Sequence, residues 1–325
     1  MNILAKEHIE KAYKNIKSNV VKSNLIYADK ISLISHAKVH LKLENQQITG
    51  SFKIRGASNK IINLFSQNPK VTKVVAASTG NHAAAVAYAA QKYNVQTIIF
   101  APESLSDSKL QNLKNHKIEL KLIGKQSSET ERLAFEYAAE KGLPFIHPYN
   151  DPDVISGQGT IAIELLDQLK NFDAVFVPIG GGGLISGIAT YLKEVAPEIK
   201  VIGVQPQNAP EMHDSLICNR IVEPSDLFTI ADGTAGGLDP DTITFDICKK
   251  LVDYILLVSE DEIARSVYLI YKYHGFKVEP AAALSVSAIL KYADRFKSQK
   301  LVAILSGNKL NDKLFGAILK RYSEM

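Results

Sequence analysis

The sequence predicts an α/β protein in which two open, twisted, mainly parallel sheets are flanked by helices. The main observation behind this class is that short apolar runs alternate with segments whose apolar residues recur at helical spacing. Strand, helix and strand in this order imply parallel sheets that are covered on both faces. The chain has 325 residues, of which 46% are hydrophobic, and a single core stops growing at about 250 to 300 residues, so two lobes are expected.

Eight apolar runs are predicted to be strands. They cover residues 38–44, 73–78, 95–102, 118–124, 173–180, 200–206, 254–259 and 300–307. Helical patterns lie between most of them, for example over residues 81–93 and 127–142. The alternation breaks between residues 207 and 250, where the segment 223–242 is rich in Gly, Pro and Asp. That segment is predicted to be a long functional loop.

Charge and cysteine content exclude several classes of protein. The 38 basic and 34 acidic residues are spread along the chain and give a net charge of +4, so nucleic acid is not expected as a partner. Cys218 and Cys248 lack metal-ligand spacing, which favours a reducing compartment. The first 20 residues are charged throughout, and no apolar run approaches the ~20 residues of a membrane span. A soluble, cytoplasmic protein with no membrane partner is therefore expected.

The clearest candidate site is a run of four glycines, Gly180 to Gly183, between a predicted strand and a helix. Backbone N–H groups in such a run close on an anion at the start of a helix, which predicts a phosphate site. A flexible turn is the plain alternative. A dinucleotide site is another, but it calls for an acidic residue ~20 positions further on. The next strand ends in Gln205, which disfavours NAD.

Two further turns follow predicted strands, and ligands collect at the carboxyl ends of strands in open parallel sheets. In the first, Ser78, Thr79 and Asn81 surround Gly80 and precede His82. These polar groups are either helix N-caps or ligand contacts, and the sequence leaves both open. In the second turn, the hydroxyl of Ser306 directly follows the strand 300–307, although a Ser-Gly pair there is also ordinary turn chemistry.

Lys53 lies in the stretch TGSFKIRG, at the predicted start of a helix that follows the strand 38–44. It is either a solvated surface lysine or a lysine that forms a Schiff base from a partly desolvated pocket. An amine, a phosphate cradle, a polar loop and a lone hydroxyl are together what a pyridoxal phosphate site needs. Lys53 would take the aldehyde, Gly180 to Gly183 the phosphate, and Ser306 would face the ring nitrogen.

The motifs ENQQITGSFKIRGA, ASTGNH, GGGGL and VEPAAA follow one another in an order and spacing that resemble the threonine/serine dehydratase and serine racemase family. Members of that family are fold-type II pyridoxal phosphate enzymes, with a fold like the tryptophan synthase β subunit. The resemblance runs from about Ser23 to Lys309. It implies a large cofactor-binding domain of residues 1–72 and 148–325, an inserted small domain of 73–147, and the cofactor in the cleft between them. A C-terminal regulatory domain is not expected after Ser306.

The resemblance also implies roles for individual residues. Lys53 would hold the cofactor and then remove the Cα proton of the substrate as general base. Asn81 would contact the ring oxygen of the cofactor. Gly180, Gly181, Gly182 and Gly183, with Leu184, would bind its phosphate. Ser306 would meet the pyridine nitrogen, and a serine there favours elimination of a β-hydroxyl over transamination.

The same resemblance places Ser78, Thr79 and Gly80 at the carboxylate of the substrate. Thr79 occupies the position where racemases carry a serine that serves the second face of Cα, and where threonine dehydratases commonly carry alanine. A threonine keeps the hydroxyl but adds a methyl group and a stiffer side chain. Thr79 is therefore a candidate catalytic residue whose presence alone does not separate a lyase from a racemase.

Some positions depart from the family pattern. Tyr149 follows His-Pro where the racemases carry an asparagine, which removes one expected cofactor contact. At the metal site of some members, Gln205 is neutral, Ala209 offers only its carbonyl, and Glu211 alone keeps its charge. A divalent ion prefers several charged oxygen ligands, so no metal is expected.

The function predicted from these residues is a lyase that acts on a small β-hydroxy amino acid. It would convert L-threonine or L-serine into a 2-oxo acid and ammonia by β-elimination. A serine racemase is the alternative within the family, and a catalytically silent ligand-binding homologue is the alternative from another class. A sulfide-using synthase is disfavoured because GSFKIRG resembles the dehydratase-type lysine motif. A homodimer is expected.

Overall fold

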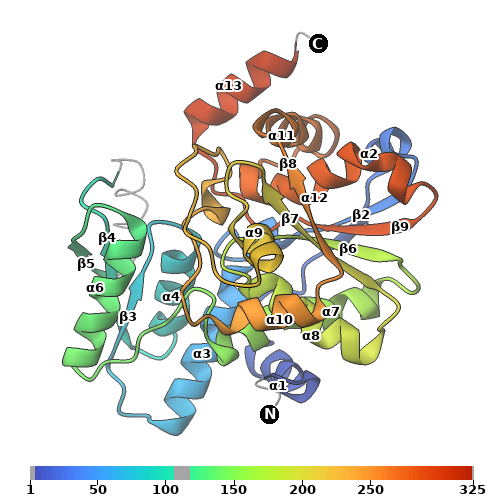
Figure 1. Ribbon diagram of the computed structural model, residues 1–325. Helices are drawn as coiled ribbons and strands as arrows, with labels where there is room; N and C mark the ends of the chain where they lie inside the picture. The colour runs from blue at the N-terminus through green and yellow to red at the C-terminus, as the bar shows by residue number, and fades with distance from the viewer. Residues whose placement is uncertain (1–3, 106–117, 324–325) are drawn as a thin grey trace.

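The computed structural model describes residues 4–105 and 118–323, which form two separate β-sheets (Figure 1). The large sheet has the strand order β1-β2-β9-β6-β7-β8 and the small sheet has the order β3-β4-β5. The strands of the large sheet are β1 (Leu25–Tyr27), β2 (Lys38–Lys42), β9 (Lys300–Ile304), β6 (Ala174–Pro178), β7 (Lys200–Pro206) and β8 (Tyr254–Val258). Those of the small sheet are β3 (Lys73–Ala77), β4 (Gln96–Ala101) and β5 (Ile118–Leu122).

Both sheets are parallel except at one edge, so the predicted fold class is confirmed. Each of the eight apolar runs contains one of these strands. The exception is β1, which pairs antiparallel with β2 and was not predicted. Its three residues, Leu25 to Tyr27, are too few to show an alternating pattern, and none of them is fully buried.

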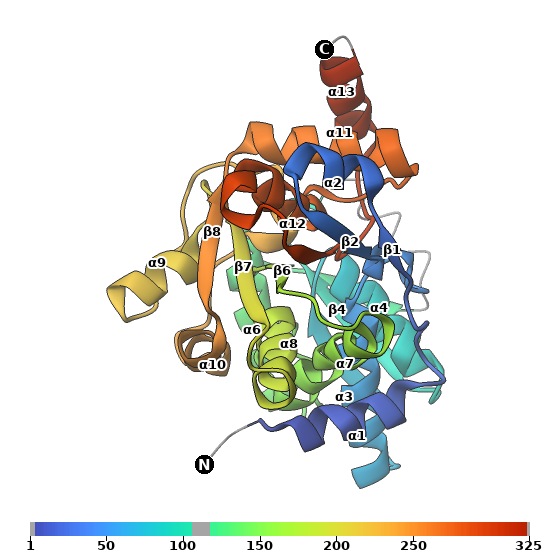
Figure 2. The ribbon, with the colours of Figure 1, turned by 90° about the vertical axis from the view of Figure 1, so that its right-hand side faces the viewer.

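Helices cover both faces of the large sheet (Figure 2). One face carries α2 (Asp29–Ser35), α11 (Glu260–His274) and α12 (Pro280–Lys291), with α13 (Asp312–Ser323) packed on α11. The other carries α1 (Lys6–Ile16), α7 (Pro152–Gln168), α8 (Gly183–Val195), α9 (Glu211–Cys218) and α10 (Ile243–Leu251). Successive side chains of β6 point to opposite faces of the sheet and so contribute to both cores. Phe176 packs on the first face, and Val175 and Val177 pack on the second. Short 3₁₀ turns are η1 (Glu44–Gln46), η2 (Asp232–Thr234) and η3 (Ala293–Phe296).

The small sheet is covered in the same way. On one face, Val74 and Ala76 of β3 pack with α4 (Asn81–Gln91) and α3 (Lys53–Gln67). On the other face, Val75 and Ala77 pack with α6 (Ser127–Glu140). Alanines fill most of the buried side of α4, so this helix lies close to α3.

Four buried charged side chains hold the start of α3 in place, and we call them the buried charge quartet: Lys42, Glu44, Arg55 and Glu164. Arg55 donates to both carboxylates, at 2.7 to 2.9 Å, and Lys42 lies 2.5 Å from Glu164. The quartet joins β2, η1, α3 and α7 and sums to zero charge. It holds the helix whose first residue is Lys53.

Among the residues that the structure describes, no helix is both long and apolar enough to cross a bilayer.

Candidate active site

Lys53 begins α3 and points to the segment that leads from the small sheet back to the large one. Its Nζ donates to the carbonyl oxygen of Pro148 at 2.8 Å, and the side chain is half-buried. Burial lowers the pKa of the Lys53 amine to about 8, although the carboxylates of Glu131 and Glu279 act in the opposite direction. At pH 7 about a tenth of this amine is therefore uncharged, which is the form that attacks an aldehyde.

Ser306 lies beside Lys53 although 253 positions separate them in the sequence. It follows β9 and is almost fully buried. Its carbonyl accepts from the backbone N–H of Phe52 at 3.1 Å, and Gly307 forms an isolated bridge with Ser51. The chain before α3 is thus hydrogen-bonded to the end of β9, and this contact brings the predicted lysine and the predicted hydroxyl together.

The four glycines form the turn between β6 and α8, as predicted. Gly182 has a φ of 85°, a left-handed conformation that favours glycine. A Cβ on Gly181 would lie 2.3 Å from the ring of Tyr149, and one on Gly183 would lie 3.0 Å from the same residue. The turn is therefore a cradle that only glycine fits, and Leu184 is buried in the first turn of α8 behind it.

Tyr149, the residue that departs from the family pattern, packs directly against this cradle. Its hydroxyl accepts from the backbone N–H of Asp239 at 2.9 Å. Burial raises the pKa of the Tyr149 hydroxyl well above its ordinary value, so the ring stays neutral. Thr244 closes the cradle on another side, because its hydroxyl donates to the carbonyl of Gly181 at 2.7 Å.

Asn81 is held by a carboxylate that the sequence analysis had left without a role. Its amide nitrogen donates to both oxygens of Glu279 at 2.8 and 3.0 Å, while its own oxygen is buried without a partner among the described residues. Burial raises the pKa of Glu279 to about 7. Glu279 also explains why residue 307 is glycine, since a Cβ there would lie 2.4 Å from Oε1.

The polar turn of residues 78–80 lies at the start of α4. The backbone N–H of Gly80 donates to Ser78 Oγ at 3.1 Å, and Gly80 is the N-cap of the helix. The first N–H groups of a helix have no intrahelical acceptor and favour an anion. Thr79 is half-buried in the same turn. Ser78 Oγ accepts only the N–H of Gly80 itself, and no side chain caps α4, so the capping alternative is wrong for these residues.

His82 follows Asn81 in the first turn of α4 and is buried. Its Nε2 lies 2.8 Å from the carbonyl oxygen of Ile146, so Nε2 carries the hydrogen and donates it. Burial first and the charge of Lys53 second lower the pKa of His82 to about 3. The imidazole is therefore neutral and ties α4 to the segment whose next residues contact Lys53.

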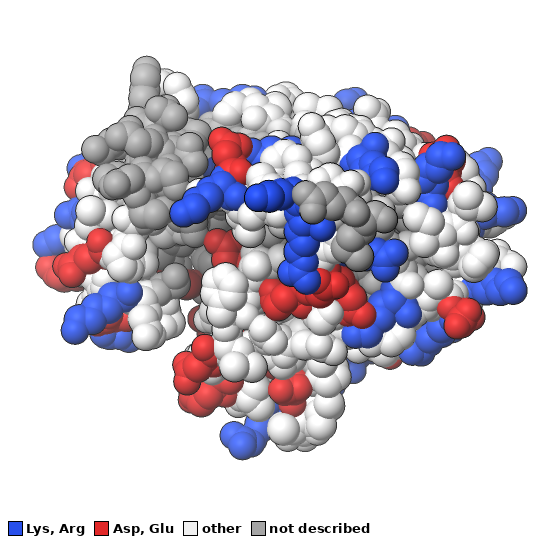
Figure 3. Space-filling view, turned by 90° about the horizontal axis from the view of Figure 1, so that it is seen from above, with Lys and Arg blue, Asp and Glu red and all other residues white. Residues whose placement is uncertain are grey.

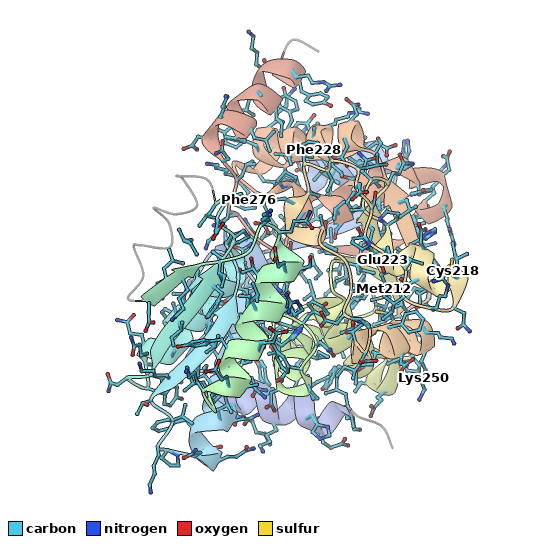
Figure 4. The ribbon with its side chains drawn as sticks, turned by 60° about the vertical axis from the view of Figure 1, so that its left-hand side comes forward. Met212, Cys218, Glu223, Phe228, Lys250 and Phe276 are labelled. Atoms are coloured by element: carbon cyan, nitrogen blue, oxygen red, sulfur yellow. The ribbon has the colours of Figure 1, made fainter. Side chains whose placement is uncertain are left out.

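The residues suspected of metal binding elsewhere in the chain are engaged in hydrogen bonds. The Gln205 amide donates to the Ala209 carbonyl at 3.4 Å and accepts from the backbone of His213 at 2.9 Å. Glu211 accepts from the backbone of Ser225 at 3.3 Å. Glu211 also lines a cavity of about 490 Å³ between α9 and the residues that follow it, which include Glu223; Cys218 and Glu223 are labelled in Figure 4. The amide nitrogen and the amide oxygen of Gln205 each have one partner in the protein, and the absence of a metal stays a prediction.

Several site residues were not found from the sequence. Glu279 belongs to the motif VEPAAA, where a glutamate that precedes a proline at the start of a helix was a usable signal. Glu131 acts on the charge of Lys53 and lies close to His147 and Asp239, yet these three residues come from three distant segments. No spacing in the sequence connects them.

The chain is similar to known proteins over most of its length. Residues 16–307 match the model of a family described as pyridoxal-phosphate dependent enzyme. An L-threonine ammonia-lyase from Thermotoga maritima is 38% identical over 97% of this chain and 78% of its own length. Among solved structures, processed threonine deaminase isoform 2 from Solanum lycopersicum has a TM-score of 0.90 at 33% identity and covers 98% of this chain and 89% of its own. The serine racemase from Dictyostelium discoideum has a TM-score of 0.86 at 31% identity and covers 95% and 99%.

Proposed function

Because this chain belongs to the family of pyridoxal-phosphate-dependent enzymes, we propose that it is an ammonia-lyase that converts L-threonine or L-serine into a 2-oxo acid and ammonia. The observation that carries this proposal is the meeting of a partly neutral amine, Lys53, with the end of β9 and a site bounded by a glycine cradle. The names of relatives at 33% and 38% identity support threonine as the substrate.

The residues of the cleft fit pyridoxal phosphate. Gly180 to Gly183 and Leu184 would hold the phosphate in the cradle, where a Cβ has no room. Asn81, whose buried oxygen lacks a partner, would lie at the ring oxygen, and Ser306 at the ring nitrogen. Lys53 would hold the aldehyde carbon. When bound, the cofactor supplies a ring that withdraws electrons from the Cα of an attached amino acid.

Each of the chain's own groups would then have a separate role in the reaction. Lys53 Nζ, with its pKa near 8, accepts the Cα proton. The free N–H groups at the start of α4, with Ser78, Thr79 and Gly80, orient the substrate carboxylate. Ser306 offers a hydroxyl and not a carboxylate, so it does not hold a proton on the ring nitrogen. That choice favours loss of the β-hydroxyl over transamination.

The proposed division of the chain is a large domain of residues 1–72 and 148–325 and a small inserted domain of 73–147. The separation of the two sheets supports it, and Figure 3 shows a hollow between the lobe that carries the small sheet and the rest of the molecule. We further propose a homodimer, supported by the exposed apolar side chains of Tyr27, Leu33 and Ile48. Two unpaired cysteines support a cytoplasmic location.

The direct test of the function is a panel of β-hydroxy amino acids that is assayed for ammonia and 2-oxo acid. We expect equal amounts of the two products from L-threonine or L-serine. Release of neither product from any member of the panel by cofactor-loaded protein would leave the silent ligand-binding alternative.

Gly181→Ala tests the phosphate cradle. The new methyl group would lie 2.3 to 2.5 Å from ring atoms of Tyr149, so the ring must move into the cradle's surroundings. We expect the affinity for pyridoxal phosphate to fall by about tenfold or more, as measured by fluorescence titration. Gly316→Ala on α13 is the control, because nothing lies within 4 Å of its added Cβ. Equal affinities in the two variants would place the phosphate elsewhere.

Thr79→Ala separates the lyase from the serine racemase, which the Dictyostelium neighbour keeps as a second candidate. Lys53 reaches one face of Cα, so racemisation needs a second acid on the other face. We expect the variant to lose any conversion of L-serine to D-serine and to keep most of its dehydration of L-threonine. Chiral analysis of serine and 2-oxo acid formation are measured on the same samples. Loss of both activities would make Thr79 part of the lyase machinery.

A further inference from the structure

Three ionisable side chains from three separate elements meet next to Pro148, the residue that Lys53 contacts, and we call them the carboxylate cluster. Glu131 comes from α6, His147 from the segment after the small sheet, and Asp239 from the loop before α10. His147 Nε2 lies 2.8 Å from Asp239 and 3.2 Å from Glu131. The side chains are 15% to 33% exposed. The cluster therefore sits at the rim of the cleft, partly shielded from water.

The hydrogen bonds of His147 define its charge. Its Nδ1 accepts from the backbone N–H groups of Tyr149 and Asn150 at 3.2 and 2.8 Å. Since Nδ1 is an acceptor, the ring hydrogen is on Nε2, and the imidazole is neutral. Nε2 then donates to Asp239 and has no lone pair for a metal ion, while Oε1 of Glu131 has no hydrogen-bond partner among the described residues. His147 thus binds Asp239 and lies beside Glu131 without adding a positive charge to the two carboxylates.

The carboxylate cluster affects the pKa of the Lys53 amine. His147 directly precedes Pro148, whose carbonyl accepts from Lys53. The carboxylates whose charges work against the fall in the pKa of Lys53 are Glu131 first and Glu279 second. Lys53 therefore stands between two acidic groups. The other nearby cation, Lys309, lies 3.3 Å from the carbonyl of Gly80 and faces Glu279.

We propose that Glu131, which lies beside His147 and Asp239, is a specificity-determining residue that excludes amino acids with a second carboxylate and admits neutral side chains. This inference rests on the proposed function and names the substrate class of the same site. The α-carboxylate has the start of α4 as its partner, whereas a second carboxylate enters a cleft whose rim already carries two. Like charges a few Å apart in a partly dry site lower the affinity by about 10- to 100-fold.

The experiment measures binding with amino acids that lack a β-hydroxyl, so that it does not depend on elimination. Cofactor-loaded protein is titrated with L-alanine and with L-aspartate, and the dissociation constants come from the change in cofactor absorbance. Glu131→Gln keeps the size of the side chain and removes its charge. Glu136→Gln is the matched control, because it lies on the same helix, pairs with Arg132 at the surface and changes the net charge equally.

We expect the dissociation constant of wild-type protein for L-aspartate to exceed that for L-alanine by at least about tenfold. In Glu131→Gln the ratio of these two dissociation constants should be about tenfold smaller than in wild type. Glu136→Gln should keep the wild-type ratio, and Asp239→Asn should narrow it as Glu131→Gln does. The proposal is overturned by equal ratios in wild type and Glu131→Gln, or by an equal change in Glu136→Gln. A failure of the proposed function would be seen separately. In that case the protein would release no ammonia from L-threonine, although the ratios of the dissociation constants were as expected.

Discussion

Lys53→Ala is expected to lose the covalent attachment of pyridoxal phosphate and to turn over L-threonine at least about a thousandfold more slowly than wild type. The substitution removes both the amine that holds the cofactor and the base that accepts the Cα proton. The protein should stay folded, because the side chain lines a cleft and Nζ makes its hydrogen bond to one backbone carbonyl. The measurements are the absorbance of the bound cofactor, the release of ammonia, and the far-ultraviolet circular dichroism of the variant.

Two controls separate the chemistry of Lys53 from its charge and its place on α3. Lys53→Arg keeps a cation at this position but cannot attach the cofactor, so it should be as inactive as the alanine variant. Lys60→Ala removes a lysine from the same helix that is paired with Asp151 and Asp153, at 2.7 and 3.2 Å. We expect Lys60→Ala to keep the attached cofactor. Normal turnover by either Lys53 variant would remove this residue from the site.

Glu164→Gln is expected to lower the free energy of unfolding by about 3 to 5 kcal/mol. Glu164 is buried and accepts from Arg55 and Lys42, which are themselves buried. The neutral amide leaves the buried charge quartet with two cations and one carboxylate, and an uncompensated buried charge is costly. Since Arg55 is two residues after Lys53 in α3, the loss also loosens the position of the reacting amine.

Urea unfolding measures this change, and a second variant on the same helix provides the comparison. Asp167→Asn removes a carboxylate of α7 that pairs with Lys22 at the surface. Solvent screens that pair, so we expect no measurable change in stability. Equal unfolding midpoints for Glu164→Gln and wild type would mean that the quartet does not anchor α3.

The parts of this fold that could be predicted from the sequence are those with a local signal. Each parallel strand is a short apolar run, for example β6 over Ala174–Pro178, and a buried parallel strand needs no partner in the pattern to be found. The four glycines and Lys53 were found for a related reason. Their chemistry is unusual for the turn and the helix start in which they occur.

The rest depends on contacts between distant segments. Tyr149 was singled out only as a departure from the family pattern, and the structure shows that it packs against Gly181 of the cradle. Glu131 and Asp239 are ordinary acidic residues of a helix and a loop in the sequence. They acquire a common environment only because α6 and the loop before α10 bring them to His147, which donates to Asp239 and lies 3.2 Å from Glu131. The roles of the site residues stay predictions until they are tested on the protein.

The central claim is that Lys53 carries the cofactor, and borohydride reduction of the cofactor-loaded protein followed by peptide mapping tests it most directly. Reduction fixes the cofactor to whichever lysine holds it, and mass spectrometry then locates the adduct. We expect one pyridoxyl group for each chain, on the peptide that contains Lys53. An adduct on any other lysine, or none on Lys53 while the cofactor is bound, would contradict the account.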